Sequence, residues 1–183
     1  LLPIILASKY GKDKATIKAA ELFDKHIDPG VPRIILADTF GREISDTTAV
    51  ARYFGKREHT VRIDTCDECL GEGCTPFEGS NTGIDPDRKT GKGVTIELVE
   101  RVRQAQLEMG LEKTAGIFLS GGFGDEKKAE IFAKANKEWK KRKGSALFRG
   151  VGIGEVAQGI ICTADVFLVD GRPLAKDGRP EKV

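Results

Sequence analysis

Short aliphatic and β-branched runs alternate with longer segments of helical period along this sequence, and that alternation limits the folds open to it. The strand candidates are Arg33–Asp38, His59–Asp64, Gly116–Ser120 and Leu147–Ile153, with Val166–Val169 as the edge of a final hairpin. The helix candidates are Asp13–Lys25, Ile44–Phe54, Val94–Met109 and Glu126–Lys141. The pattern predicts α/β structure, with about four successive βα units over a parallel sheet.

Parallel strands of this kind occur both in doubly wound sheets and in (β/α)₈ barrels, and periodicity alone does not separate the two. A barrel of eight units needs roughly 250 residues, whereas this chain has 183. The barrel interpretation therefore predicts a partial, irregular barrel, with residues 1–183 forming a single domain and further strands missing. The sequence opens with Leu1, not Met, directly in an apolar run, which suggests that the natural chain begins earlier.

Charge and hydropathy exclude several classes of protein. The 30 Lys and Arg residues nearly balance 28 Asp and Glu residues, and the basic side chains are scattered except for the run Lys140–Lys143. Because this run ends a predicted helix, where cations suit the helix dipole, it predicts no nucleic-acid partner. No stretch approaches the roughly 18 apolar residues of a membrane span, so we expect a cytoplasmic protein without a membrane partner.

Residues 65–93 interrupt the regular pattern, because they show no period and contain three of the four cysteines. A loop of this length is usually functional or disordered, and its place after a strand puts it at the carboxyl edge of the sheet. Cys66, Cys69 and Cys74 have a C-x₂-C-x₄-C spacing, and Cys162 lies far along the chain. Three thiolates could bind Zn²⁺, although a structural site normally has four ligands. Unliganded thiols and a Cys66–Cys69 disulfide are the alternatives.

Two consecutive strand candidates end in glycine-rich turns. The first turn contains Ser120, Gly121 and Gly122, and the second contains Gly150, Gly152 and Gly154. Glycine lets the backbone approach an anion closely, and in barrels a phosphate site is frequently built by the loops after the last two strands. These six residues are therefore candidates for phosphate binding, and the alternative is that glycine simply ends each strand.

Two other strand candidates end in a carboxylate followed by threonine, at Asp38 and Asp64. An acid at the carboxyl end of a buried strand can hold a metal ion or stabilise a developing cation, and the alternative is a cap for the next turn. Arg62 lies two residues before Asp64, so both side chains point to one side of the strand. We therefore take Asp38, Arg62 and Asp64 as candidate catalytic residues.

Five blocks in one order give the chain a specific resemblance. They are Asp38-Thr39-Phe40, Val61-Arg62-Ile63-Asp64-Thr65, Leu119-Ser120-Gly121-Gly122, Gly150-Val151-Gly152-Ile153-Gly154, and Leu168-Val169-Asp170-Gly171-Arg172-Pro173-Leu174-Ala175-Lys176. This order resembles the later part of the nicotinate phosphoribosyltransferases. The resemblance runs through most of the chain.

The resemblance implies a type II phosphoribosyltransferase fold, an irregular α/β barrel that usually forms a dimer. It implies an enzyme of NAD biosynthesis that makes nicotinate mononucleotide from nicotinate and 5-phosphoribosyl 1-diphosphate, with Mg²⁺ and with coupled ATP hydrolysis. By position, Asp38 and Asp64 would stabilise the ribosyl centre and its metal-bound diphosphate. Arg62 would contact the base or a phosphate, and the glycine turns would hold the 5′-phosphate.

The sequence departs from the family in three places. Where the family has a Met-Pro-His motif, this chain has Leu2-Pro3-Ile4, so Ile4 stands at the position of the histidine that ATP phosphorylates. If that alignment holds, ATP coupling through a phosphohistidine is excluded. The insertion after Thr65 is longer than expected, and the family's N-terminal domain and first strands have no counterpart here. The chain therefore resembles an incomplete part of the enzyme.

Two alternatives remain from the sequence. One is a related phosphoribosyltransferase that uses quinolinate or another base, against which the lack of a second basic cluster counts mildly. The other is a non-catalytic relative that binds phosphate or zinc, for which Ile4 and the incomplete fold are the main support.

Overall fold

A computed structural model of the chain describes residues 2–154 and 165–178, and its centre is a parallel sheet with strand order β1-β2-β3-β4. The strands are β1 (Ile34–Leu36), β2 (His59–Ile63), β3 (Ala115–Leu119) and β4 (Gly150–Val151). Helices connect them in turn, namely α3 (Glu43–Phe54), α4 (Ile96–Glu108) and α5 (Glu126–Lys143). The predicted α/β class with a parallel sheet is therefore confirmed.

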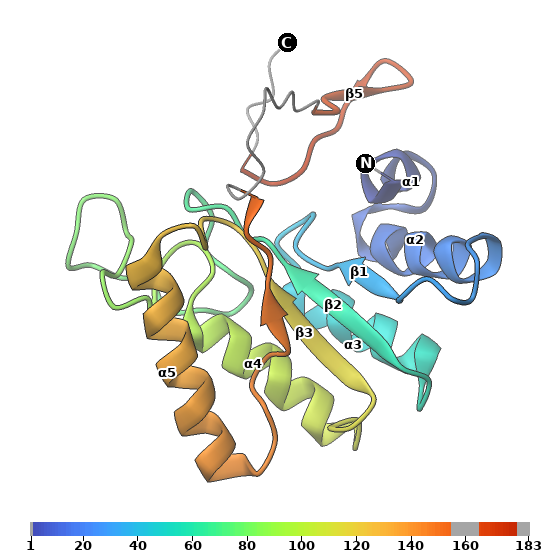
Figure 1. Cartoon of the computed structure of the whole chain (residues 1–183). Helices are drawn as coiled ribbons and strands as arrows, with labels where there is room; N and C mark the ends of the chain where they lie inside the picture. The colour runs from blue at the N-terminus through green and yellow to red at the C-terminus, as the bar shows by residue number, and fades with distance from the viewer. Residues whose placement is uncertain (1, 155–164, 179–183) are drawn as a thin grey trace.

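One face of the sheet is packed against helices. In Figure 1, β2 and β3 lie in front of α3 and α4. Alternate strand residues such as Val61, Ile63 and Ile117 are buried in the same core as Val50 of α3 and Leu98 of α4. Because side chains alternate along a strand, the residues between them face the other way. On that opposite face the side chains of Ile34 and Arg62 are exposed.

The helix boundaries follow local sequence signals. Asp125 accepts hydrogen bonds from the amides of Lys127 and Lys128 and so caps the start of α5, and Gly144 ends that helix in the left-handed conformation. Thr95 caps α4 in the same way. These devices satisfy backbone groups that helix ends leave unpaired. The four predicted helices are found within a few residues of their expected bounds, whereas β4 is shorter than predicted.

Two further helices and a hairpin complete the described chain. Helix α1 (Leu2–Tyr10) was not predicted, and α2 (Lys12–His26) matches the first predicted helix. The predicted final hairpin is present as β5 (Leu168–Val169) paired with β6 (Arg172–Pro173). A second, small apolar cluster joins α1 to this hairpin through Ile4, Phe40, Val169 and Leu174. The cluster brings the end of the described chain close to its beginning.

Residues 65–93 form an irregular but internally bonded segment. Asp85 accepts hydrogen bonds from the amides of Asp87, Lys89 and Thr90, which closes a tight turn. Glu72 accepts from two amides in the first turn of α3 and thereby caps that helix from a distance. The segment is thus attached to the carboxyl edge of the sheet, as the sequence predicts.

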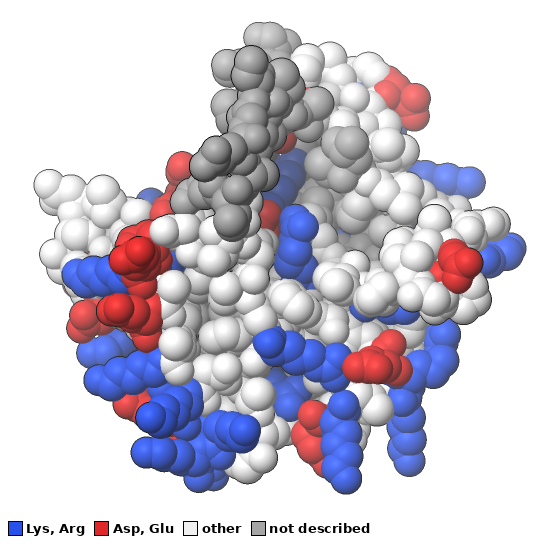
Figure 2. All heavy atoms as spheres, viewed as in Figure 1, with Lys and Arg blue, Asp and Glu red and all other residues white. Residues whose placement is uncertain are grey.

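Two surface features concern the basic run and the apolar character of the helices. Figure 2 shows basic side chains gathered at the end of α5, and the run Lys140–Lys143 occupies the exposed last turn of that helix. Among the described residues, no helix combines the length and apolar character that crossing a membrane requires.

Candidate functional site

The carboxyl ends of the four parallel strands meet at one edge of the sheet, and the candidate residues follow them. A cleft of about 620 Å³ lies there. It is lined by Arg62, Asp64, Ser120, Gly121, Gly122, Phe123, Gly124, Gly152, Ile153 and Gly154. A smaller hollow of about 230 Å³ shares Asp64, Gly121 and Gly122 with this cleft and reaches Lys176. The structure therefore brings together two of the three candidate catalytic residues and five of the six candidate phosphate-binding residues.

Gly150 is the exception among the predicted phosphate-binding residues. It lies in β4, beside Phe118 of β3, and does not line the cleft. A Cβ atom placed on Gly150 would lie 2.8 Å from the Phe118 ring. Gly150 thus has a packing role, because the aromatic ring needs the space that a side chain would fill.

The turn after β3 presents free backbone donors to the cleft region. Gly121 and Gly122 have φ angles of +88° and +65°, which favour glycine. The amides of residues 121–124 donate no hydrogen bond to any described residue. Successive unpaired amides in a turn can form the kind of concavity that binds anions. The start of α5 itself is already capped by Asp125, so any anion would be held by this turn ahead of the helix.

Ser120 lies at the base of this turn, between two backbone anchors. Its amide donates to Ile63 O at 2.9 Å, and the Gly152 amide donates to Leu119 O at 2.7 Å. The Ser120 hydroxyl is buried and has no hydrogen-bond partner among the described residues. A buried hydroxyl without a partner is costly, so this group is available to a ligand in the cleft.

Asp38 and Asp64 are linked by a lysine that sequence reasoning did not identify as a site residue. The Asp38 carboxylate is fully buried and forms an ion pair with Lys176. Lys176 Nζ also donates to the backbone oxygen of Asp64 at 3.2 Å and lies 3.9 Å from Asp64 Oδ2. One ammonium group therefore contacts both predicted catalytic aspartates.

The two aspartates differ in their surroundings. Burial raises the pKa of Asp38, and the charge of Lys176 opposes that rise. Asp38 Oδ1 accepts no hydrogen bond from the described residues. Asp64 is 29% exposed and lies 3.4 Å from Arg62 Nη2, so the prediction that these two side chains share one side of β2 is confirmed. Asp64 lines the cleft, whereas the buried Asp38 does not.

The cysteines of residues 65–93 separate into two groups. Cys66 and Cys69 have their sulfur atoms 3.0 Å apart, next to the backbone of Asp177. Cys74 is buried in the main core instead. Burial raises the pKa of both Cys69 and Cys74 to about 12, so these thiols are protonated at neutral pH.

Of the predicted zinc ligands, Cys66 and Cys69 lie together, whereas Cys74 lies apart from them in the main core. Within residues 2–154 and 165–178, no group of three or more metal-ligating side chains is found. The fourth cysteine, Cys162, lies outside the described residues.

Ile4 lies in α1 and is buried in the small cluster that also contains Phe40. Its aliphatic side chain has no nitrogen that could carry a phosphoryl group. The position that the resemblance compares with a histidine therefore contributes packing to the structure.

Comparison of the sequence with family models finds no match, and comparison with curated proteins finds none either. The resemblance to nicotinate phosphoribosyltransferases stays a hypothesis.

Proposed function

We propose that this chain binds 5-phosphoribosyl 1-diphosphate at the carboxyl edge of its sheet and belongs to an enzyme that transfers the phosphoribosyl group to nicotinate. The observation that carries the proposal is one cleft that the unpaired amides of the glycine turn and the neighbouring Asp64 carboxylate line together. Phosphoribosyl diphosphates carry an anionic group at each end of a ribose, and the anomeric carbon becomes cationic as diphosphate leaves. A site for them needs anion donors and a carboxylate within one small cleft.

The glycine turn suits the 5′-phosphate. Glycines at 121, 122 and 124 leave the backbone uncovered, and the unpaired Ser120 hydroxyl adds a side-chain donor. Backbone amides hold a phosphate without bringing a mobile side chain, which reduces the entropy lost on binding.

The aspartates suit the ribosyl centre. Asp64 would stabilise positive charge at the anomeric carbon, and Lys176 would keep the neighbouring Asp38 ionised by pairing with it. Arg62 is exposed beside Asp64, so it would contact the nicotinate carboxylate or a phosphate.

The residues also fit Mg²⁺, which the resemblance implies. Magnesium is usually held by one or two carboxylates together with substrate phosphates. Asp64 lines the cleft and would supply such a carboxylate, whereas Asp38 is buried behind it and paired with Lys176. The ion would neutralise charge on the diphosphate.

The proposal includes neither a phosphohistidine nor bound zinc, because Ile4 offers no nitrogen and the described cysteines do not form a ligand set. Assembly of two copies is implied by the resemblance and stays a prediction.

Isothermal titration of the chain with 5-phosphoribosyl 1-diphosphate and Mg²⁺ tests the proposal. We expect saturable binding, and nicotinate in a second titration should bind more tightly to the complex than quinolinate does. A preference for quinolinate would favour the alternative base. Absence of any binding would contradict the proposal.

A matched pair of glycine variants locates the site. Gly121 and Gly144 both have positive φ angles, so alanine strains the backbone similarly at either place. A Cβ atom on Gly121 would lie 3.1 Å from Asp64 Oδ1, whereas one on Gly144 would meet no atom within 4 Å. We expect Gly121→Ala to abolish binding and Gly144→Ala to keep it. Equal affinities would place the ligand elsewhere.

A further inference from the structure

Lys128 is a buried lysine that neither the sequence motifs nor the cleft lining identifies. It lies in the first turn of α5, directly behind the glycine turn, and only 3% of its surface is exposed. Its sequence neighbour Lys127 is exposed to solvent. Burying an ammonium group is costly, and an apolar side chain would pack there without that cost. The cost of burying the Lys128 ammonium group must therefore be offset by specific contacts.

The contacts of Lys128 are directed at the glycine turn. Its Nζ donates a hydrogen bond of 2.7 Å to the backbone oxygen of Gly121 and lies 4.9 Å from the centre of the Phe123 ring. A Cβ atom on Gly122 would lie 3.7 Å from the same nitrogen. The ammonium group thus supports the turn from the side opposite to solvent.

Peptide geometry gives this contact a consequence. The oxygen of Gly121 and the N–H of Gly122 belong to one planar trans peptide and point in opposite directions. When Lys128 holds the oxygen toward α5, the Gly122 N–H must point away from α5. The Gly122 amide donates to no described group, so it is available to a ligand.

The two glycines make this restraint necessary. Glycine adopts positive and negative φ angles with similar ease, so a peptide between two glycines can rotate at little cost. In the rotated orientation the Gly121 oxygen would face the anion and repel it. A cation behind the turn favours the productive orientation, because it binds the oxygen and polarises the peptide.

We propose that Lys128 is a positioning residue that fixes the Gly121–Gly122 peptide with its N–H toward the phosphate group of the ligand. This inference rests on the proposed function, because it assumes that the glycine turn binds phosphate. It assigns Lys128 an effect on affinity without any contact to the ligand.

Three variants separate this role from plain packing. Lys128→Met keeps the length of the side chain and removes the charge and the donor. Lys128→Arg keeps both, and Lys128→Gln keeps a neutral donor should the methionine variant fail to fold. Lys127→Met is the matched control, since it removes the same charge one position away on the exposed surface. Thermal unfolding without ligand confirms that each variant is folded.

The measurement is the dissociation constant for inorganic phosphate, together with the shift of the Gly122 amide signal in ¹⁵N–¹H spectra. We expect Lys128→Met to bind phosphate at least about tenfold more weakly and Lys128→Gln to be intermediate. Lys128→Arg should recover most of the affinity, and Lys127→Met should stay within about twofold of the parent. Phosphate should shift the Gly122 signal in the parent and much less in the methionine variant.

Two results would overturn the inference, and they differ. If the parent binds phosphate and Lys128→Met binds it equally well, Lys128 has no positioning role although the anion site stands. If the parent binds neither phosphate nor 5-phosphoribosyl 1-diphosphate, the anion site itself is wrong, and the role of Lys128 falls with it.

Discussion

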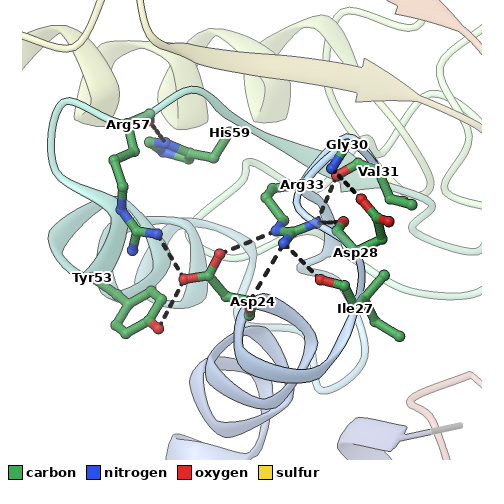
Figure 3. Close-up of polar contacts among 9 residues, drawn as sticks. All are labelled: Asp24, Ile27, Asp28, Gly30, Val31, Arg33, Tyr53, Arg57 and His59. Atoms are coloured by element: carbon green, nitrogen blue, oxygen red, sulfur yellow. Dashed lines mark hydrogen bonds and ion pairs between the residues drawn. The ribbon is translucent and has the colours of Figure 1, made fainter.

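The two edges of the sheet use their charged groups in opposite ways. At the amino edge, Asp24 accepts hydrogen bonds from Arg33, Tyr53 and Arg57, and Arg33 also donates to backbone oxygens around Ile27 (Figure 3). At the carboxyl edge, Asp38 Oδ1, the Ser120 hydroxyl and the amides of the glycine turn have no described partner. A network in which every group has a partner stabilises a fold, whereas unpaired polar groups in a cleft are free to bind a ligand.

The pKa directions show the same difference. The hydrogen bond from Arg57, supported by those from Arg33 and Tyr53, holds the pKa of Asp24 below its ordinary value. Burial raises the pKa of Asp38, Glu43 and Asp46, all of which lie near the carboxyl edge. The arginines therefore favour the charged form of Asp24, whereas burial opposes the charged forms of the three carboxylates near the carboxyl edge. Such a cost of ionisation is typical of functional sites.

Among substitutions of charged groups, the largest effect should come from Asp64→Asn at the carboxyl edge. We expect the affinity for 5-phosphoribosyl 1-diphosphate with Mg²⁺ to fall by about 100-fold. The substitution removes the charged contact between Asp64 and the Mg²⁺ ion, which would contribute roughly 2.7 kcal/mol. Stability should change by less than about 0.5 kcal/mol, since the pair with Arg62 is partly exposed. Titration calorimetry and urea unfolding measure the two quantities.

Asp87→Asn is the control for this variant. Asp87 is 65% exposed in the loop and pairs with Lys89, so the substitution removes the same charge away from the cleft. Its affinity should equal that of the parent. A loss of stability without a loss of affinity in Asp64→Asn would reverse the contrast between the two edges.

The sequence predicted most of this arrangement because it depends on local periodicity. Short aliphatic and β-branched runs between helical segments located the strands. Parallel strands necessarily place Asp38, Asp64 and the glycine turns at one edge of the sheet. Helix α1 escaped prediction because its run is apolar all round, with Leu2 and Ile5 exposed, and so shows no amphipathic period.

The rest depends on contacts that no local pattern encodes. Lys176 donates a hydrogen bond to Asp64, which lies 112 positions earlier in the chain. This contact exists only in the folded chain, so no local sequence pattern predicts it. Gly150 and Gly121 belong to similar motifs, yet Phe118 covers the first and the cleft exposes the second. Lys128 escaped prediction because it follows Lys127, an ordinary surface lysine of the same helix, and the sequence does not distinguish the two.

A smaller effect is expected at the amino edge, where Asp24→Asn should lower the free energy of unfolding by about 2 kcal/mol. The substitution removes the charge that Arg33 and Arg57 both contact, and the Arg33 side chain is only 10% exposed. Ligand affinity should not change. Urea unfolding and calorimetry measure both. Asp28→Asn is the control, because Asp28 is exposed and its carboxylate accepts only from the Gly30 amide among described residues. Equal stability of the two variants would mean that the network of Figure 3 contributes little.

The smallest effect concerns pH and again separates the two edges. Asp46 lies in the first turn of α3, where burial raises its pKa from 3.8 to about 6. A raised pKa means that the folded state holds the proton more tightly than the unfolded state does. Its contribution to stability is therefore greatest below the unfolded pKa and is lost as pH rises through the folded pKa. Lowering the pH from 7 to 5 should stabilise the protein by about 1 kcal/mol through this group.

Asp46→Asn should remove that gain, which urea unfolding at the two pH values measures. Asp38 and Glu43, whose pKa values are also raised, act in both proteins, so the difference between variant and parent isolates Asp46. Asp24 adds nothing in this range, because its lowered pKa keeps it ionised in both states. Asp13→Asn, at an exposed position in the first turn of α2, should keep the parent's response. An unchanged response in Asp46→Asn would mean that the buried carboxylates of the carboxyl edge do not carry the cost assigned to them.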